Sequence, residues 1–305
     1  MLIASRAHRA GFTLPEFLVV VVLLGVLGGV TTRVVMRQQQ FYRGATEMMT
    51  VRTNLRELGG ILPTDLRGLS SVGGDIYAMS DSAIEFRLPA GNSIVCSIGP
   101  GRLTMVVPPT ALVSRSDVTA WLNGPRLGDS LFVYDEGAGP TTSDDTWQLS
   151  TLSLAPTAGV CPTSSGYTGS LSEATAALTL TLASALNTGV VPGSVIRFFR
   201  HARYKLFQPS TGSGWYLGYV DCPGGVCGAL QAVAGPFLPY SATASATGLR
   251  LVYRDSTDAV TTTRANVARI DITARKQTAN TVQMPGGSND YYLDSLVVSV
   301  ALRNR

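Results

Sequence analysis

The longest apolar stretch of the chain lies close to its N-terminus. Residues 17–32 contain no charged side chain, and the apolar stretch reaches back to Phe12 if the single Glu16 is allowed. An α-helix rises about 1.5 Å per residue and needs about 20 apolar residues to cross the hydrocarbon core of a bilayer. We therefore predict a transmembrane helix over residues 12–32.

A secretory signal peptide is the first alternative for this segment. Its apolar region would span about 7 to 15 residues and would end in a small-residue cleavage site. Here the apolar run leads into TTRVVMR, residues 31–37, which contains no Ala-x-Ala-like site. Cleavage after the apolar segment is therefore not expected, and the helix should stay on the protein.

The segment that follows is polar but keeps a helical pattern. Its apolar residues advance by threes and fours, which places them on one face of a helix. They are Phe41, Ala45, Met48, Val51, Leu55, Leu58 and Leu62. We expect residues 33–69 to be an amphipathic extension of the membrane helix that packs against a globular domain. Gly59, Gly60 and Pro63 predict a break or kink near its end, with Thr64 as the cap of a short turn.

Beyond Ser70 the pattern changes to short alternating segments separated by Gly, Pro, Ser and Asp. Ile84 and Phe86, for example, alternate with charged residues, as in half-buried strands. The other predicted strands cover residues 93–98, 103–107, 130–134, 147–154, 176–182, 195–207, 215–220, 249–254, 267–274 and 291–304. Short connections favour antiparallel pairing. We predict an α+β fold, with the long N-terminal helix packed on a mainly antiparallel β domain over residues 70–305, and with residues 108–193 as surface insertions.

Composition agrees with this division of the chain. Of the 305 residues 45% are hydrophobic and only 14% are charged, whereas an ordinary soluble domain carries about 25% charge. A disordered, highly charged chain is thereby excluded. One apolar helix and a Ser/Thr/Gly-rich β domain together account for the low charge and for the mean hydropathy of +0.20.

The residues in front of the apolar helix resemble the type IV prepilin signature. A leader containing Arg6 and Arg9 precedes GFTLPE, residues 11–16, and the uninterrupted apolar helix follows. The resemblance implies that a membrane-embedded prepilin peptidase removes residues 1–11 by cutting between Gly11 and Phe12, and then N-methylates Phe12. Arginines flank the helix on both sides, so the positive-inside rule does not give its orientation. The resemblance places the leader in the cytoplasm and the β domain in the periplasm.

Glu16 is the one carboxylate of the apolar segment. A charged side chain at the centre of a membrane helix costs about 2.5 to 3.5 kcal/mol on insertion scales. The prepilin resemblance implies that Glu16 neutralises the positively charged N-terminus of a neighbouring subunit and so sets the axial register of helices in a filament. The alternative is an acid that reaches the cytoplasmic headgroups and has no assembly role.

Two further segments resemble narrower groups of the same family. The helix end at residues 55–69 and the last strand pair are similar to J-type minor pseudopilins of type II secretion and to W-type minor pilins of type IV pili. The resemblance implies a non-enzymatic minor subunit of an envelope-spanning filament, near its tip and anchored in the inner membrane. Its partners would be other pilins or pseudopilins, prepilin peptidase, the inner-membrane assembly platform and membrane lipid. The alternative is a membrane-anchored periplasmic binding module, including one that binds DNA for uptake.

Four cysteines lie beyond the predicted membrane helix. An even number of cysteines in an exported domain indicates disulfides, and four cysteines allow three connectivities. Cys222 and Cys227 flank a Pro-Gly-Gly-Val loop that one bridge can close, which leaves Cys96 with Cys161. A metal site is the alternative, but C-x-x-C spacing is absent and His201 is the only histidine after the leader, so we predict no metal or cofactor site.

Other chemistry finds little support in the sequence. There is no Gly-x-Ser-x-Gly elbow or phosphate-binding loop. Calcium could bind the acids at residues 135–136 and 144–145, although solvated loop acids are the commoner case. Arg200, Arg203 and Lys205 alternate with aromatic residues on one strand, as in surfaces that bind single-stranded nucleic acid. An exposed sheet edge gives the same pattern. Without Arg6 and Arg9 the net charge falls from +4 to +2, which is too little to argue for nucleic acid.

Overall fold

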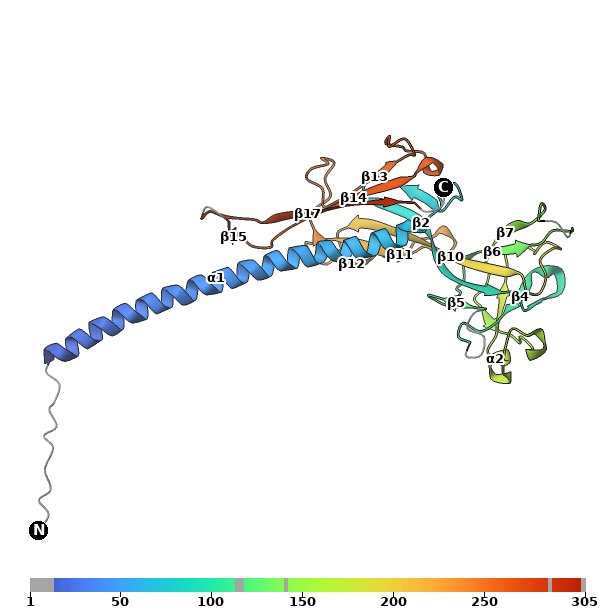
Figure 1. Ribbon diagram of the computed structural model, residues 1–305, viewed down its shortest axis with the longest axis horizontal. Helices are drawn as coiled ribbons and strands as arrows, with labels where there is room; N and C mark the ends of the chain where they lie inside the picture. Colours follow the sequence, from blue (N-terminus) through green and yellow to red (C-terminus); the bar gives the residue numbers. More distant parts are fainter. Residues whose placement is uncertain (1–13, 113–117, 140–141, 285–286, 303–305) are drawn as a thin grey trace, which may run out of the picture. The chain divides into compact units, whose positions relative to one another are not determined.

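The computed structural model describes residues 14–112, 118–139, 142–284 and 287–302 (Figure 1). A single long helix, α1 (Leu14–Arg67), is followed by a mainly antiparallel β region, which confirms the predicted α+β class. The chain divides into two compact units. One contains the described residues of Met1–Thr53 together with Gln277–Leu293, and the other contains those of Asn54–Lys276 together with Asp294–Arg305.

Strands occupy most of the chain after α1. They are β1 (Ile76–Met79), β2 (Ala83–Ile94), β3 (Ser97–Ile98), β4 (Thr104–Val107), β5 (Ala120–Trp121), β6 (Ser130–Asp135), β7 (Thr146–Thr151), β8 (Thr157–Ala158), β9 (Leu178–Thr181), β10 (Val195–Phe207), β11 (Trp215–Asp221), β12 (Gln231–Phe237), β13 (Leu249–Arg254), β14 (Arg269–Gln277), β15 (Val282–Gln283), β16 (Asn289–Asp290) and β17 (Leu293–Ala301). A short helix, α2 (Leu171–Thr175), precedes β9. The predicted strand over residues 195–207 has the observed bounds of β10.

Strand β10 organises the largest sheet. Strand β2 pairs along almost its whole length on one side. On the other side β10 changes partner, because residues 196–199 pair with β6 and residues 202–207 pair with β11. The sheet therefore continues through β6 to β7 beside the first half of β10, and through β11 to β12 beside the second half.

The region predicted as surface insertions is instead part of a folded core. Residues 108–193 supply β5 to β9, and β9 joins β3, β4 and β8 in a four-stranded sheet. Its apolar side chains are buried against those of neighbouring strands: Leu131, Val133, Leu152, Leu180, Leu182, Leu186 and Val190 pack with Val95, Met105, Val107, Ile196 and Phe198. The prediction was wrong because a Ser/Thr/Gly-rich composition hides the alternation that places one apolar residue in two on the inner face.

The C-terminal end of α1 belongs to the same unit as the large sheet. Leu55, Leu58, Leu62 and Leu66 are buried, so the predicted apolar face packs as expected there. The predicted break at Gly59, Gly60 and Pro63 is wrong, because the helix continues through Pro63 to Arg67. Burial of Leu62 and Leu66 on the same stripe favours helix over a turn. Gly59 leaves room for a neighbour, since a Cβ there would lie 2.8 Å from Leu296 Cδ2.

The other unit combines α1 with the hairpin of β15 and β16. Val282 of the hairpin contacts the helix at Gly44, where a Cβ would lie 3.6 Å from the valine side chain. The Glu47 carboxylate accepts hydrogen bonds from the backbone and side-chain amides of Asn280, at 2.9 and 2.5 Å. These bonds hold the pKa of Glu47 below its ordinary value. The guanidinium of Arg52 donates to the Tyr292 hydroxyl at 3.1 Å.

Candidate functional site

The N-terminal part of α1 is not covered by any other part of the chain that the structure describes. Its large side chains from Leu14 to Met36 are exposed. Among the described residues, α1 is the helix that is long and apolar enough to cross a membrane. Thr31 and Thr32 donate their hydroxyls to the carbonyls of Leu27 and Gly28 at 2.8 Å, which satisfies polar groups within the helix itself. This segment has the properties of a membrane anchor.

The residues expected to be processed lie at the start of this helix. Gly11 and Phe12 fall outside the described residues. Glu16 lies in the first turn of α1, where a negative charge also interacts favourably with the helix dipole. A Cβ at Gly25, Gly28 or Gly29 would meet nothing within 4 Å. Because these three residues have no side chains, the helix is thinner along this stretch.

Both pairs of cysteines expected from the sequence form disulfides. Cys96 and Cys161 join with a Cα–Cα distance of 5.7 Å, and Cys222 and Cys227 join with one of 3.9 Å. The second bridge closes a loop that packs against Gly128. Gly128 has a φ of 83°, and a Cβ there would lie 2.6 Å from the backbone nitrogen of Gly224, so glycine is required at this contact.

The basic strand presents its charged residues to two different sides of the sheet. Arg200 lies inside the domain with only 5% of its side chain exposed. Its Nε and one terminal nitrogen donate to the two carboxylate oxygens of Asp129 at 2.9 and 2.8 Å, and the same nitrogen donates to the Gly124 carbonyl at 3.1 Å. The bonds to Asp129 raise the pKa of Arg200. Arg200 is therefore a buried structural residue and not an accessible nucleic-acid contact.

The other side of this strand carries His201, Arg203 and Lys205. Glu85 on β2 accepts a hydrogen bond from Arg203 Nε at 2.6 Å, and its second oxygen lies 3.2 Å from His201 Nε2. The His201 ring also packs on Tyr77, with 4.2 Å between centroids. Of the three proposed nucleic-acid residues only Lys205 is exposed. The described strand therefore does not present a row of exposed, unpaired cations.

The His201 contacts predict a loss of stability in mild acid. Burial lowers the pKa of His201, against the opposing hydrogen bond to Glu85, and the facing cations Arg203 and Arg87 lower it further. The unfolded chain, with a pKa of about 6.5, therefore takes up this proton first as the pH falls. We expect the melting temperature to decrease from pH 7 to pH 5.5, and His201→Gln to remove part of that decrease. Thermal unfolding at both pH values measures this, and equal pH dependence in the two proteins would contradict it.

The acidic loop residues bind backbone amides. Asp144 accepts from the amides of Ala138 and Gly139 at 2.9 Å, and these bonds lower its pKa. Asp135 accepts from the Gly137 amide at 3.0 Å and from the Asn187 side chain at 2.8 Å. The described parts of the chain contain no group of three or more His, Cys, Asp or Glu side chains placed to hold a metal ion.

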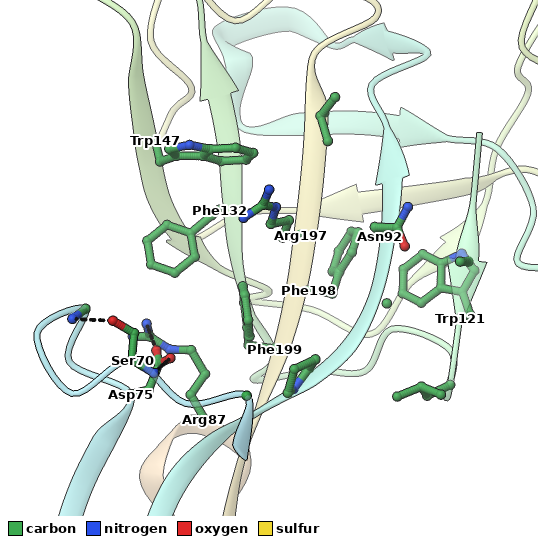
Figure 2. A pocket seen from close by; sticks show the side chains of 17 residues that line it. Ser70, Asp75, Arg87, Asn92, Trp121, Phe132, Trp147, Arg197, Phe198 and Phe199 are labelled. Atoms are coloured by element: carbon green, nitrogen blue, oxygen red, sulfur yellow. Dashed lines mark hydrogen bonds and ion pairs between the residues drawn. The ribbon is translucent and has the colours of Figure 1, made fainter. Parts of the chain in front are cut away.

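A cavity of about 850 Å³ lies over the large sheet and was not found by sequence reasoning (Figure 2). Residues of four strands border it, among them Phe132 on β6, Trp147 on β7 and Phe199 on β10, whereas the side chains of Trp121 on β5 and Phe198 on β10 pack on each other in the core. Arg87, Asn92 and Arg197 supply polar groups. The aromatic residues are visible in the sequence, but which of them border the cavity depends on strand order and register.

The comparisons identify the N-terminal segment. Residues 6–32 match the family model described as the prokaryotic N-terminal methylation motif, which is typical of type IV prepilin-like proteins. The match includes Gly11, Phe12 and Glu16, and it confirms the resemblance over this part of the chain. No curated protein and no solved structure matched the chain. The motif supports a type IV pilin-like protein that is processed by a prepilin peptidase and associates with other pilins.

Proposed function

We propose that this chain is a minor subunit of a type II secretion pseudopilus or a type IV pilus, located near the filament tip. The observation that carries the proposal is the methylation motif at residues 6–32, joined to a helix whose first half is apolar and exposed. An apolar helix surface that the described residues leave uncovered is suited first to lipid and then to the helices of other subunits. The β domain would lie in the periplasm.

The size of the β domain supports a minor rather than a major role. Residues 108–193 supply two of the four strands of a second sheet and much of a core that they share with β2, β4 and β10. A domain of this size fits most easily into a filament that contains few copies of it, at a position where no further subunit covers one of its ends. Piliation and protein secretion, measured separately in a strain that lacks this chain, distinguish the two filament types.

Processing at the N-terminus is the direct test of the proposal. In cells with an active prepilin peptidase, we expect the mature chain to begin at N-methylated Phe12. Gly11→Asp should leave most of the protein with its leader, because the charged side chain would occupy the position next to the cleaved bond. Intact-mass and N-terminal peptide mass spectrometry measure both forms, and Ala10→Ser is the neighbouring control that should be processed. A wild-type chain that retains Met1 would overturn the proposal.

A further inference from the structure

Three arginines follow the apolar stretch of α1 without an acid between them. Residues 17–46 contain no Asp or Glu, and their charged residues are Arg33, Arg37 and Arg43. Residues 14–43 are all exposed, so no other described part of the chain covers this stretch of the helix. Its positive charge is therefore available to a partner outside the chain.

The first two of these arginines lie at the far boundary of the membrane-spanning segment. Along the helix axis Arg33 and Arg37 are about 26 and 32 Å from Glu16, at 1.5 Å per residue. The hydrocarbon core of a bilayer is about 30 Å thick. With Glu16 at one interface, the two guanidinium groups therefore lie at the headgroups of the opposite leaflet. Arg43, about 40 Å from Glu16, lies beyond that level.

Arg33 and Arg37 project from one face of the helix. They are four residues apart, which places them about 6 Å apart along the axis and on the same side. Each guanidinium presents its N–H groups in a planar fork that matches the oxygens of a phosphate. Thr31 and Thr32 already donate their hydroxyls to carbonyls of the helix. The two guanidinium groups are thus the charged donors at this level of the helix.

The position of these arginines favours lipid over other anions. Phosphate groups already lie at this level of a bilayer, whereas a carboxylate of a neighbouring subunit would have to enter the headgroup layer to reach the guanidinium groups. The headgroup of phosphatidylcholine carries its own cation and is neutral as a whole. An anionic headgroup such as that of phosphatidylglycerol has no internal cation, so the arginines are stabilised more by it.

We propose that Arg33 and Arg37 bind the headgroups of anionic phospholipids in the leaflet at the C-terminal end of the membrane-spanning segment. The bound phosphates then fix how deeply the helix lies in the bilayer, because moving either guanidinium into the hydrocarbon core would break these contacts. The proposal rests on the membrane anchor and does not depend on assembly into a filament.

Native mass spectrometry of the full-length chain in detergent micelles tests the proposal. The probes are dioleoyl phosphatidylglycerol and dioleoyl phosphatidylcholine in equal amounts, and the ratio of their adducts is measured. An arginine at an anionic membrane surface favours binding by about fivefold, so the wild-type ratio should be about 25. Arg33→Gln and Arg37→Gln should each lower the ratio about fivefold, and the double variant should bring it close to unity. Raising the salt concentration should lower the wild-type ratio.

Arg56→Gln is the matched control, because it removes an exposed arginine from the part of the same helix that belongs to the β domain. It should leave the lipid ratio unchanged, and circular dichroism verifies that each variant keeps its helix. The proposal fails if the wild-type chain shows no lipid preference, if the double variant keeps the preference, or if Arg56→Gln loses as much of it. It also fails if the double variant is excluded from filaments while neither protein prefers an anionic lipid, since the arginines would then contact another subunit.

The intact mass of the same samples keeps this proposal apart from the filament proposal. A retained Met1 would overturn the filament proposal. Arg6 and Arg9 would then be present in every variant, so the comparison among variants would still test lipid binding. A processed chain without a lipid preference would overturn only the proposal made for Arg33 and Arg37.

Discussion

Replacing Asp129 with alanine is expected to lower the free energy of unfolding of the β domain by about 3–5 kcal/mol. The change leaves the Arg200 guanidinium buried without the carboxylate that binds two of its nitrogens. Asp221 lies 3.9 Å away and provides only partial compensation. Arg200 is also one of the two residues between the stretches of β10 that pair with β6 and β11. Without Asp129, the pairing of β10 with β6 and with β11 should therefore be weakened near Arg200.

Thermal unfolding followed by tryptophan fluorescence measures this effect. With about 2–4 °C per kcal/mol for a domain of this size, the midpoint should fall by about 6–20 °C. Arg126→Ala is a matched control, because Arg126 forms an exposed ion pair with Asp221 at 3.3 Å nearby and should change stability by less than about 1 kcal/mol. A combined Asp129→Leu and Arg200→Met replacement should recover much of the loss. An unchanged midpoint in Asp129→Ala would contradict a structural role for the pair.

The burial of Arg200 shows both the strength and the limit of the sequence pattern. Strand β10 was predicted with its observed bounds, because alternation over many residues is a strong signal. The same alternation places Arg200 with Phe198 and Ala202 on the buried face, and Arg203 with Lys205 on the other. The nucleic-acid hypothesis took Arg200, Arg203 and Lys205 together without asking which face of the strand each one occupies, and the fold does not form that surface. Its partner Asp129 could not be found, because the pairing joins residues 71 positions apart.

The cavity could not be predicted from the alternation of apolar and polar residues, for a different reason. Trp121 belongs to a strand of two residues, which carries no alternation to detect. Its place beside β2 depends on Gly91, whose meaning is visible only when the two segments are paired. The apolar helix and the methylation motif, by contrast, were predicted because their signals are local: one uncharged stretch and one contiguous motif. The sequence therefore indicated the apolar helix and the motif but not the cavity.

Replacing Glu16 with alanine is expected to exclude the chain from filaments without reducing its amount in the membrane. Removing the carboxylate makes insertion of the helix more favourable, by up to about 2.5 to 3.5 kcal/mol at the bilayer centre. Assembly should respond in the opposite direction. In the proposed filament, Glu16 neutralises the N-terminal amine of a neighbouring subunit, and an unpaired buried charge costs about 3–5 kcal/mol. Incorporation should then fall by about 100-fold or more.

Quantitative immunoblots of sheared filaments and of membranes measure the two amounts separately. Glu57→Ala is the matched control, because Glu57 lies on the same helix in the part that belongs to the β domain. It removes the same charge outside the apolar segment and should leave incorporation unchanged. Glu16→Asp keeps the charge and should retain part of the incorporation. If Glu16→Ala enters filaments at the wild-type level, the carboxylate has no assembly role and acts only at the headgroups. A membrane anchor needs no partner for this carboxylate, whereas the proposed filament subunit needs one.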